Sequence, residues 1–139
     1  MTYAQVVVSM PIADRAVSCR FYQEAFGLEP IGEPAQDGIP EPLQFAVNDG
    51  LRLMLVPADG FRWVLGPREV APRTHAESVL GLTGATPAEV DAMVARAGAA
   101  GAEVVTAPSA QPWGYTGMFA DPDGHLWEVT AVGPEERGR

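Results

Sequence analysis

A single carboxylate near the end of the chain, Glu128, is the residue best placed to do chemistry. It lies between Trp127 and Val129 in an apolar segment that indicates a β-strand, shortly after a tight turn at Asp121–Gly124. A carboxylate in such a strand is costly unless it faces water, a polar partner or a bound metal. Glu128 is therefore a candidate general base, ligand acceptor or metal ligand. A structural role, with the carboxylate satisfied by Arg52, Gln44 or Tyr115, fits the sequence equally well.

The other metal-binding residue types give Glu128 little support. The two histidines are His75, in a joining segment, and His125, three residues before Glu128, a spacing that places strand side chains on opposite faces. The single cysteine, Cys19, excludes both an internal disulfide and a cysteine-cluster metal site. A catalytic divalent site needs about three protein ligands. We therefore expect neither a metal nor a cofactor.

Aromatic side chains gather in the joining segment and the second half of the chain. Phe119 and Trp127 lie in predicted strands, and because strand side chains alternate between two faces, we expect both in the core. Trp113 and Tyr115 lie just before a strand, where an aromatic side chain is expected at the mouth of a cleft. Trp63 lies in a joining segment of about twenty residues, and long segments of this kind are usually functional or mobile. We expect Trp63, Trp113 and Tyr115 to stack against a ligand.

Composition limits the class of protein. At 139 residues with 47% hydrophobic residues, the chain can form one compact domain with a buried core. Its net charge of −9 argues against nucleic-acid or anionic-membrane partners. No apolar run is long enough to span a bilayer, and no signal peptide is evident at the start. We expect a cytoplasmic protein.

The elements that must position these residues form two similar halves. Asp14 is expected to cap the first helix and Gly27 to end it, with Val17, Phe21 and Ala25 on its buried side. The expected elements of the first half are strands at 4–10, 28–31, 43–47 and 51–56 and a helix from Asp14 to about residue 26. A strand or flap is expected at 61–65.

The second half repeats this order. Thr86, Pro87 and Glu89 form a capping-box pattern with proline at the first helical position. The expected elements are strands at 78–83, at 103–105 and on both sides of the turn at 121–124, and a helix from Thr86 to Gly101 that buries Val90, Met93, Val94 and Ala97. The residues that mark the repeat, about 74 positions apart, are Gly27 with Gly101, Phe45 with Phe119, and Gly50 with Gly124. The same offset places Met54 at the position of Glu128.

These features resemble the vicinal-oxygen-chelate superfamily, which includes glyoxalase I, extradiol dioxygenases, and fosfomycin and bleomycin resistance proteins. The resemblance rests on the hairpin at 112–130 and on the run from Asp14 through Ala25–Pro30, and it covers residues 3–132. It implies an α+β fold in which two tandem βαβββ modules, related by a pseudo-two-fold, form a cleft. The implied parts of one glyoxalase-like domain, 1–139, are module one at about 3–57, a joining loop at about 58–76, module two at about 77–132 and a solvated tail at 133–139.

The resemblance also implies where metal ligands would lie. They would come from the first and last strands of each module, at Val7, Met54, Val79 or Leu80, and Glu128. Only Glu128 carries a suitable ligand for a hard divalent ion, because the Met54 thioether is soft and the other side chains are aliphatic. The sequence therefore predicts no metal site.

The predicted function is binding of a small molecule in the cleft without a catalytic metal. The predicted ligand-binding residues are Met54, Trp63, Trp113, Tyr115 and Glu128. The alternative is a lyase, isomerase or dioxygenase of the same superfamily, either metal-dependent through displaced ligands or metal-free with Glu128 as catalytic base. A homodimer is expected, because pairing covers exposed sheet edges.

Overall fold

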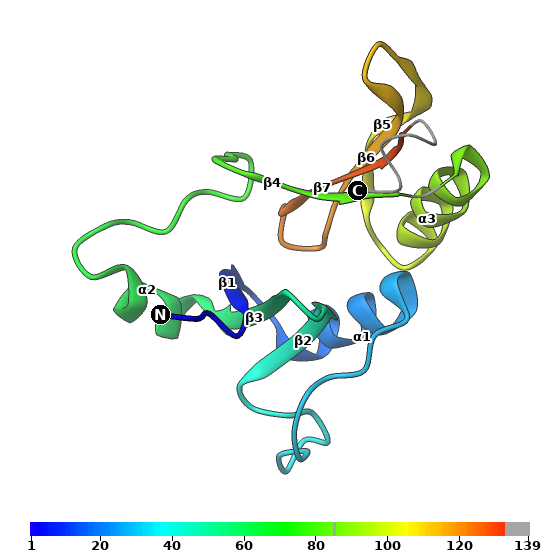
Figure 1. The fold of residues 1–139 in the computed structure, drawn as a ribbon. Coiled ribbons are helices and arrows are strands. Elements are labelled where there is room, and N and C mark those ends of the chain that lie inside the picture. The colour runs from blue at the N-terminus through cyan, green and yellow to red at the C-terminus, as the bar shows by residue number, and fades with distance from the viewer. Residues whose placement is uncertain (85, 133–139) are drawn as a thin grey trace. The chain divides into compact units, whose positions relative to one another are not determined.

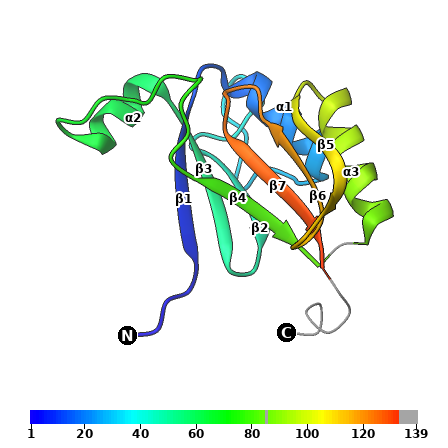
Figure 2. The ribbon, with the colours of Figure 1, turned by 90° about the horizontal axis from the view of Figure 1, so that it is seen from above.

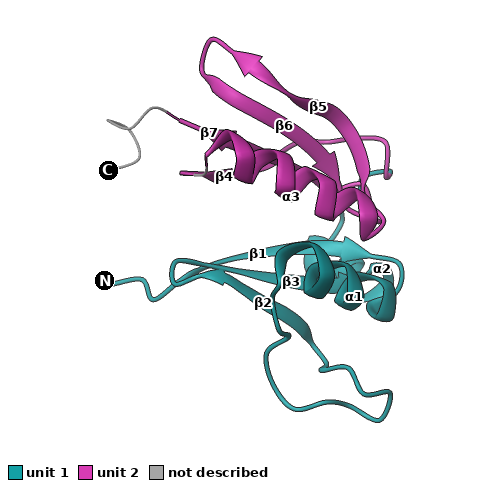
Figure 3. Ribbon diagram, turned by 90° about the vertical axis from the view of Figure 1, so that its right-hand side faces the viewer, with its two compact units in different colours: residues 1–72 teal, residues 73–139 magenta. Residues whose placement is uncertain are grey.

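The computed structural model describes residues 1–84 and 86–132, so the expected tail at 133–139 lies outside the described residues. The chain divides into two compact units, unit 1 at Met1–Pro72 and unit 2 at Arg73–Arg139 (Figure 3). The fold is α+β, with a separate sheet and packed helix in each unit. Among the described residues, no helix has the length and apolarity needed to cross a membrane.

Unit 1 is built on a three-stranded sheet in the order β1-β3-β2 (Figures 1 and 2). Strand β1 runs parallel to β3, and β2 runs antiparallel to it. Its elements are β1 (Val6–Ile12), α1 (Arg15–Phe26), β2 (Leu43–Asn48), β3 (Leu51–Pro57) and α2 (Ala58–Leu65).

Helix α1 begins and ends where the sequence predicts. The Asp14 side chain accepts hydrogen bonds from the backbone amides of Ala16 and Val17 at 2.8 and 3.3 Å. Gly27, with φ of 68°, ends the helix in the left-handed conformation that glycine adopts at low cost. The predicted buried side is only partly right, because Val17 is 38% exposed while the neighbouring positions 18 and 19 are buried.

The core of unit 1 lies between α1 and one face of the sheet. Tyr22 of α1 packs on Phe45 of β2 with ring centroids 5.6 Å apart. Phe45 pairs with Leu53 of β3, and both are fully buried. Because side chains alternate along a strand, the intervening residues, including Met54, point to the face away from α1.

One predicted strand of unit 1 does not form. Within the described part of unit 1, residues 28–31 make no regular ladder, and Ile31 alone donates a backbone hydrogen bond, at 2.9 Å, to Gln44 of β2. Pro30 has no amide hydrogen and cannot donate to a sheet, which explains why the pairing stops there.

The segment at 61–65 is expected to be a strand or flap, and the strand alternative is wrong, because the segment belongs to helix α2. Asp59 and Arg62, three positions apart, form a 2.9 Å ion pair of the kind that helical spacing allows. Phe61 and Leu65, four apart, are both half-buried on one side of the helix.

Unit 2 contains a complete βαβββ module. Its four-stranded sheet has the order β4-β7-β6-β5, with β4 parallel to β7 and the other pairs antiparallel (Figure 2). Its elements are β4 (Val79–Thr83), α3 (Pro87–Ala99), β5 (Glu103–Gln111), β6 (Gly114–Ala120) and β7 (Leu126–Ala131).

Helix α3 covers one face of this sheet (Figure 3). The predicted capping box is present, with the Thr86 hydroxyl accepting from the Glu89 amide at 3.2 Å and the Glu89 carboxylate accepting from the Thr86 amide at 3.3 Å. The predicted apolar stripe is also confirmed, because Val90, Met93, Val94 and Ala97 are all buried. Phe119 and Trp127, at 0% and 1% exposure, form the predicted aromatic core.

Candidate functional site

Glu128 lies on the face of the unit 2 sheet that α3 leaves uncovered. It pairs with Met118 of β6 and with Gly81 of β4. The covered face is identified at Gly117, because a side chain there would collide with Val94 of α3. Gly117 pairs with Val129, so Val129 faces α3 and its neighbour Glu128 faces the other way.

The surroundings of Glu128 are mostly apolar, with two hydroxyls. On the same face, the buried Thr116 and Thr130 hydroxyls share a hydrogen bond at 3.1 Å. Glu128 itself is half-buried. Within the described residues of unit 2, no side chain forms a hydrogen bond or ion pair with its carboxylate. The carboxylate is thus left to water or to a bound donor.

Met54 has the equivalent position in unit 1. It lies on β3 between Ser9 of β1 and Gln44 of β2, on the sheet face away from α1. Gln44 in turn corresponds to Met118 by the same repeat offset that relates Met54 to Glu128. The repeat therefore places a thioether in one unit where the other has a carboxylate.

The two predicted stacking aromatics of unit 2 do not lie beside Glu128. Tyr115 faces α3, where its hydroxyl donates a 2.7 Å hydrogen bond to Asp91, so it does not share a face with Glu128 as expected. Trp113 is 60% exposed in the turn between β5 and β6. It is five residues before Met118, about 17 Å along the strand direction. Trp63 lies on α2 of unit 1 and is 86% exposed.

The donor set does not fit the metal that the superfamily resemblance implies. Among the described residues, no group of three or more His, Cys, Asp or Glu side chains is placed to hold an ion. Val7 shares the face of Met54, and Val79 shares the face of Glu128, so the four positions supply one carboxylate, one thioether and two valines.

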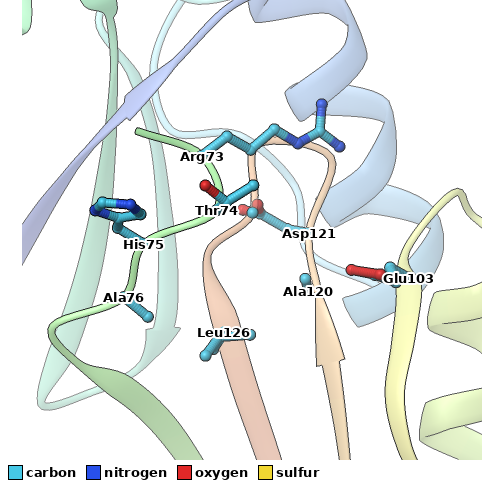
Figure 4. Close-up of a pocket in the computed structure, with 9 residues that line it drawn as sticks. Arg73, Thr74, His75, Ala76, Glu103, Ala120, Asp121 and Leu126 are labelled. Atoms are coloured by element: carbon cyan, nitrogen blue, oxygen red, sulfur yellow. The ribbon is translucent and has the colours of Figure 1, made fainter. Parts of the chain in front are cut away.

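A recess that sequence reasoning missed lies at the end of the Glu128 face (Figure 4). It has a volume of about 300 Å³ and is formed entirely by unit 2. One side is the segment 73–76, and the other includes Glu103, Ala120, Asp121 and Leu126. Ala120 and Leu126 pair with each other, and Leu126 is two residues from Glu128 on the same face.

The turn between β6 and β7 fixes one wall of the recess. Asp121 is 2% exposed, and its Oδ1 accepts hydrogen bonds from the amides of Asp123 and His125, both at 2.9 Å. Gly124 has φ of 90°, and a Cβ there would overlap the carbonyl oxygen of Arg73. The glycine was predicted for the turn, and it also allows the close approach of the segment 73–76.

Cys19 is not a candidate nucleophile. It is buried on α1, and burial, reinforced by the nearby charge of Glu29, raises the pKa of its thiol despite the opposing effect of Arg15. Desolvation outweighs the opposing charge of Arg15, so the thiol is not activated.

Comparisons with known proteins agree with this architecture. The family model of the glyoxalase/bleomycin resistance protein/dioxygenase superfamily matches residues 4–129. The comparison with curated proteins gave no match.

Several solved structures are similar over nearly the whole chain. Hypothetical protein SA1046 from S. aureus is 22% identical, with a TM-score of 0.78 and 95% of each chain covered, which supports the fold alone. A glyoxalase-related enzyme from Fulvimarina pelagi is 29% identical, with a TM-score of 0.74 over 91% of this chain and 87% of that one. TnmS3, an antibiotic binding protein from Streptomyces sp. CB03234, is 27% identical, with a TM-score of 0.64 over 96% and 98%.

Proposed function

Because this chain belongs to the glyoxalase/bleomycin resistance protein/dioxygenase superfamily, we propose that it binds a small organic molecule without a catalytic metal. The ligand lies against the unit 2 sheet face that α3 leaves uncovered, with the Glu128 carboxylate accepting a hydrogen bond from it. Met54 is a further proposed ligand contact on the equivalent face of unit 1. The exposed Trp63 and Trp113 are proposed aromatic contacts of the ligand. Tyr115 is left out of the proposed site because its hydroxyl is hydrogen-bonded to Asp91 of α3.

One observation carries this proposal: Glu128 is half-buried on an uncovered face and has no partner among the described residues of its unit. A carboxylate in such a place gains most from a donor that a ligand supplies. Met118 and the Thr116–Thr130 pair surround it with apolar and hydroxyl surface. A mostly apolar surface with few polar groups is the usual make-up of a small-molecule site.

The comparisons support binding as the primary activity. TnmS3, at 27% identity and nearly full coverage, is an antibiotic binding protein. A binding protein of this kind needs a shaped surface and a few polar anchors, and it does not need the metal ligands that this chain lacks at Val7, Met54 and Val79.

The alternative function is that of a metal-free enzyme with Glu128 as general base. The similarity to the glyoxalase-related enzyme from Fulvimarina pelagi favours it, as does the lack of a protein partner for the carboxylate within the described part of unit 2. A base must reach the proton that it removes, and the uncovered face permits that. Turnover of a bound ligand that is abolished in Glu128→Gln would favour the enzyme.

The direct test is a thermal-shift screen of metabolites and antibiotics, since a ligand that binds the folded state raises the melting temperature. Compounds that bind are measured again by calorimetry with Glu128→Gln. For a donor-bearing ligand we expect a loss of about 1–3 kcal/mol, or about fivefold to a hundredfold in Kd.

The matched control is Glu77→Gln, which removes the same charge from an exposed position of unit 2 outside the site. Equal losses in the two variants would show a general charge effect and would refute the role of Glu128.

Metal analysis of the purified protein gives a second test. We expect no stoichiometric Zn, Ni, Fe or Mn. Stoichiometric metal that disappears in Glu128→Gln would overturn the metal-free proposal.

We also propose that the protein is a homodimer. The sheet of unit 1 ends in β1 and β2, and that of unit 2 ends in β4 and β5, so each has edges that pairing with a second copy would cover. Light scattering after size exclusion should give twice the chain mass. A monomer throughout the micromolar range would refute this.

A further inference from the structure

The recess at the β6–β7 turn has a geometry that suits one end of a ligand. Its wall at Ala120 and Leu126 continues the face that carries Glu128, which lies about 7 Å further along β7. Its volume of about 300 Å³ is at the lower end of the range for small-molecule sites. The recess therefore suits a small polar group at one end of a ligand, together with the adjoining part of the ligand's apolar body.

The charges around the recess favour a cation. The ionisable side chains that line it are the carboxylates of Glu103 and Asp121, the guanidinium of Arg73 and the imidazole of His75. Figure 4 shows the Glu103 carboxylate pointing toward Ala120. Among the described residues, neither Arg73 nor Glu103 forms an ion pair. No protein cation therefore neutralises Glu103, and the net charge of −9 adds to the attraction for a cation.

The cation that fits is organic. The described residues offer no group of three metal-ligating side chains, so the recess does not meet the needs of a metal ion. Ala76, Ala120 and Leu126 provide apolar surface that an alkyl or aromatic amine would cover. An ammonium group donates hydrogen bonds and matches carboxylate acceptors.

We propose that the recess is a subsite for the ammonium group of a small organic amine, held beside Glu103 and Asp121, with the apolar body of the ligand extending over Leu126 toward Glu128. This inference deepens the proposed function and rests on it for the direction in which the ligand extends. The segment 73–76 closes the subsite, and its position depends on the absence of a side chain at Gly124.

The test uses 2-phenylethylamine as probe, with 2-phenylethanol and 3-phenylpropionate as neutral and anionic analogues. Each is titrated into ¹⁵N-labelled protein and followed by amide chemical shifts. We expect the amine to shift the amides of Ala76, Gly124 and Leu126, and we expect the anion to shift none of them. Equal shifts with all three probes, or none with the amine, would overturn the proposal.

Variants separate the recess from the Glu128 site. Glu103→Gln should weaken binding of the amine about threefold to tenfold, whereas Glu77→Gln, which removes the same charge outside the recess, should change it little. Ala76→Phe should block the recess without unfolding the unit, because Ala76 is exposed. Unchanged affinity in both Glu103→Gln and Ala76→Phe would refute the subsite.

Glu128→Gln distinguishes the two proposals. If the amine still shifts the amides around the recess in this variant but binds with lower affinity, both proposals are supported. If the amine shifts the same amides with unchanged affinity, the subsite is supported and the proposed role of Glu128 is refuted. Amine-induced shifts near Glu128 alone, with none at Gly124, refute the subsite and leave the proposed function standing.

Discussion

The hydroxyl of Tyr115 donates a 2.7 Å hydrogen bond to the carboxylate of Asp91, which joins strand β6 to helix α3. This contact holds the ring on the helix side of the sheet, while Glu128, paired with Met118, faces the opposite side. Tyr115 thus has a structural partner, and the two predicted site residues are separated by the thickness of one sheet.

The Tyr115–Asp91 contact predicts an altered tyrosine titration. The hydrogen bond to Asp91, with smaller effects of burial and the Asp91 charge, raises the pKa of the Tyr115 hydroxyl above its usual range. The hydrogen bond from the protonated Tyr115 hydroxyl to Asp91 therefore contributes fully to folding stability below the ordinary tyrosine pKa. This contribution is lost as the pH rises through the raised pKa of Tyr115.

Asp91→Asn should lower that pKa toward the ordinary value, as measured by ultraviolet titration of tyrosinate. Comparison with Tyr115→Phe assigns the signal among the three tyrosines of the chain. An identical titration curve for Asp91→Asn and the unmodified protein would contradict the contact.

Trp127→Ala should strongly destabilise the protein. The side chain is 1% exposed beneath α3, and truncating a buried tryptophan costs about 3–5 kcal/mol. Urea unfolding measures the loss. Trp113→Ala is the matched control, because that side chain is 60% exposed and its removal should change stability by no more than about 0.5 kcal/mol. Similar losses in both variants would show that the assignment of the core is wrong.

Arg15→Ala should loosen the segment between α1 and β2. The guanidinium donates to the carbonyls of Ile39 and Pro40 at 2.7 and 2.8 Å and forms a 2.6 Å ion pair with Asp37. Loss of the carbonyl contacts should cost about 1–2 kcal/mol in urea unfolding, with faster hydrogen exchange at Gly38. Arg20→Ala removes the same charge from an exposed position of α1 and serves as control. Equal effects would count against the contact.

Cys19 should react slowly with thiol reagents in the native protein. Burial raises its pKa, so the thiol stays protonated at neutral pH, and the reactive thiolate appears only above the ordinary cysteine range. Labelling by Ellman's reagent should be slow in buffer, should accelerate with rising pH and should be fast in urea. Rapid native labelling at neutral pH would show that the thiol is accessible.

Local signals in the sequence predicted helices α1 and α3 well, but not α2. Asp14, Gly27 and the Thr86–Glu89 capping box are short-range patterns, because a cap depends on residues within four positions of it. The repeat likewise predicted that Met54 and Glu128 occupy corresponding strand positions, since each lies four residues after its turn glycine. These features depend on backbone periodicity, which the sequence carries directly.

The sequence-based predictions failed where tertiary packing outweighs the local conformational preference of the residues. Val17 has the spacing of a buried residue, yet the inner side of α1 is centred on Phe21, Tyr22 and Ala25, because the sheet beneath sets the rotation of the helix. The residues at 28–31 have strand-like composition, but Pro30 leaves only the single bond from Ile31 to β2.

The sequence by itself determined helices α1 and α3 with their caps, the order of elements in the second half, and the corresponding strand positions of Met54 and Glu128. The tertiary structure decided which face each side chain joins. Strand pairing placed Tyr115 with α3 and Glu128 on the uncovered face. It also brought the segment 73–76 against the turn at Gly124, forming a recess from residues about fifty positions apart. Such contacts arise from the register between strands and from chain segments that meet only on folding, and neither is encoded by local periodicity.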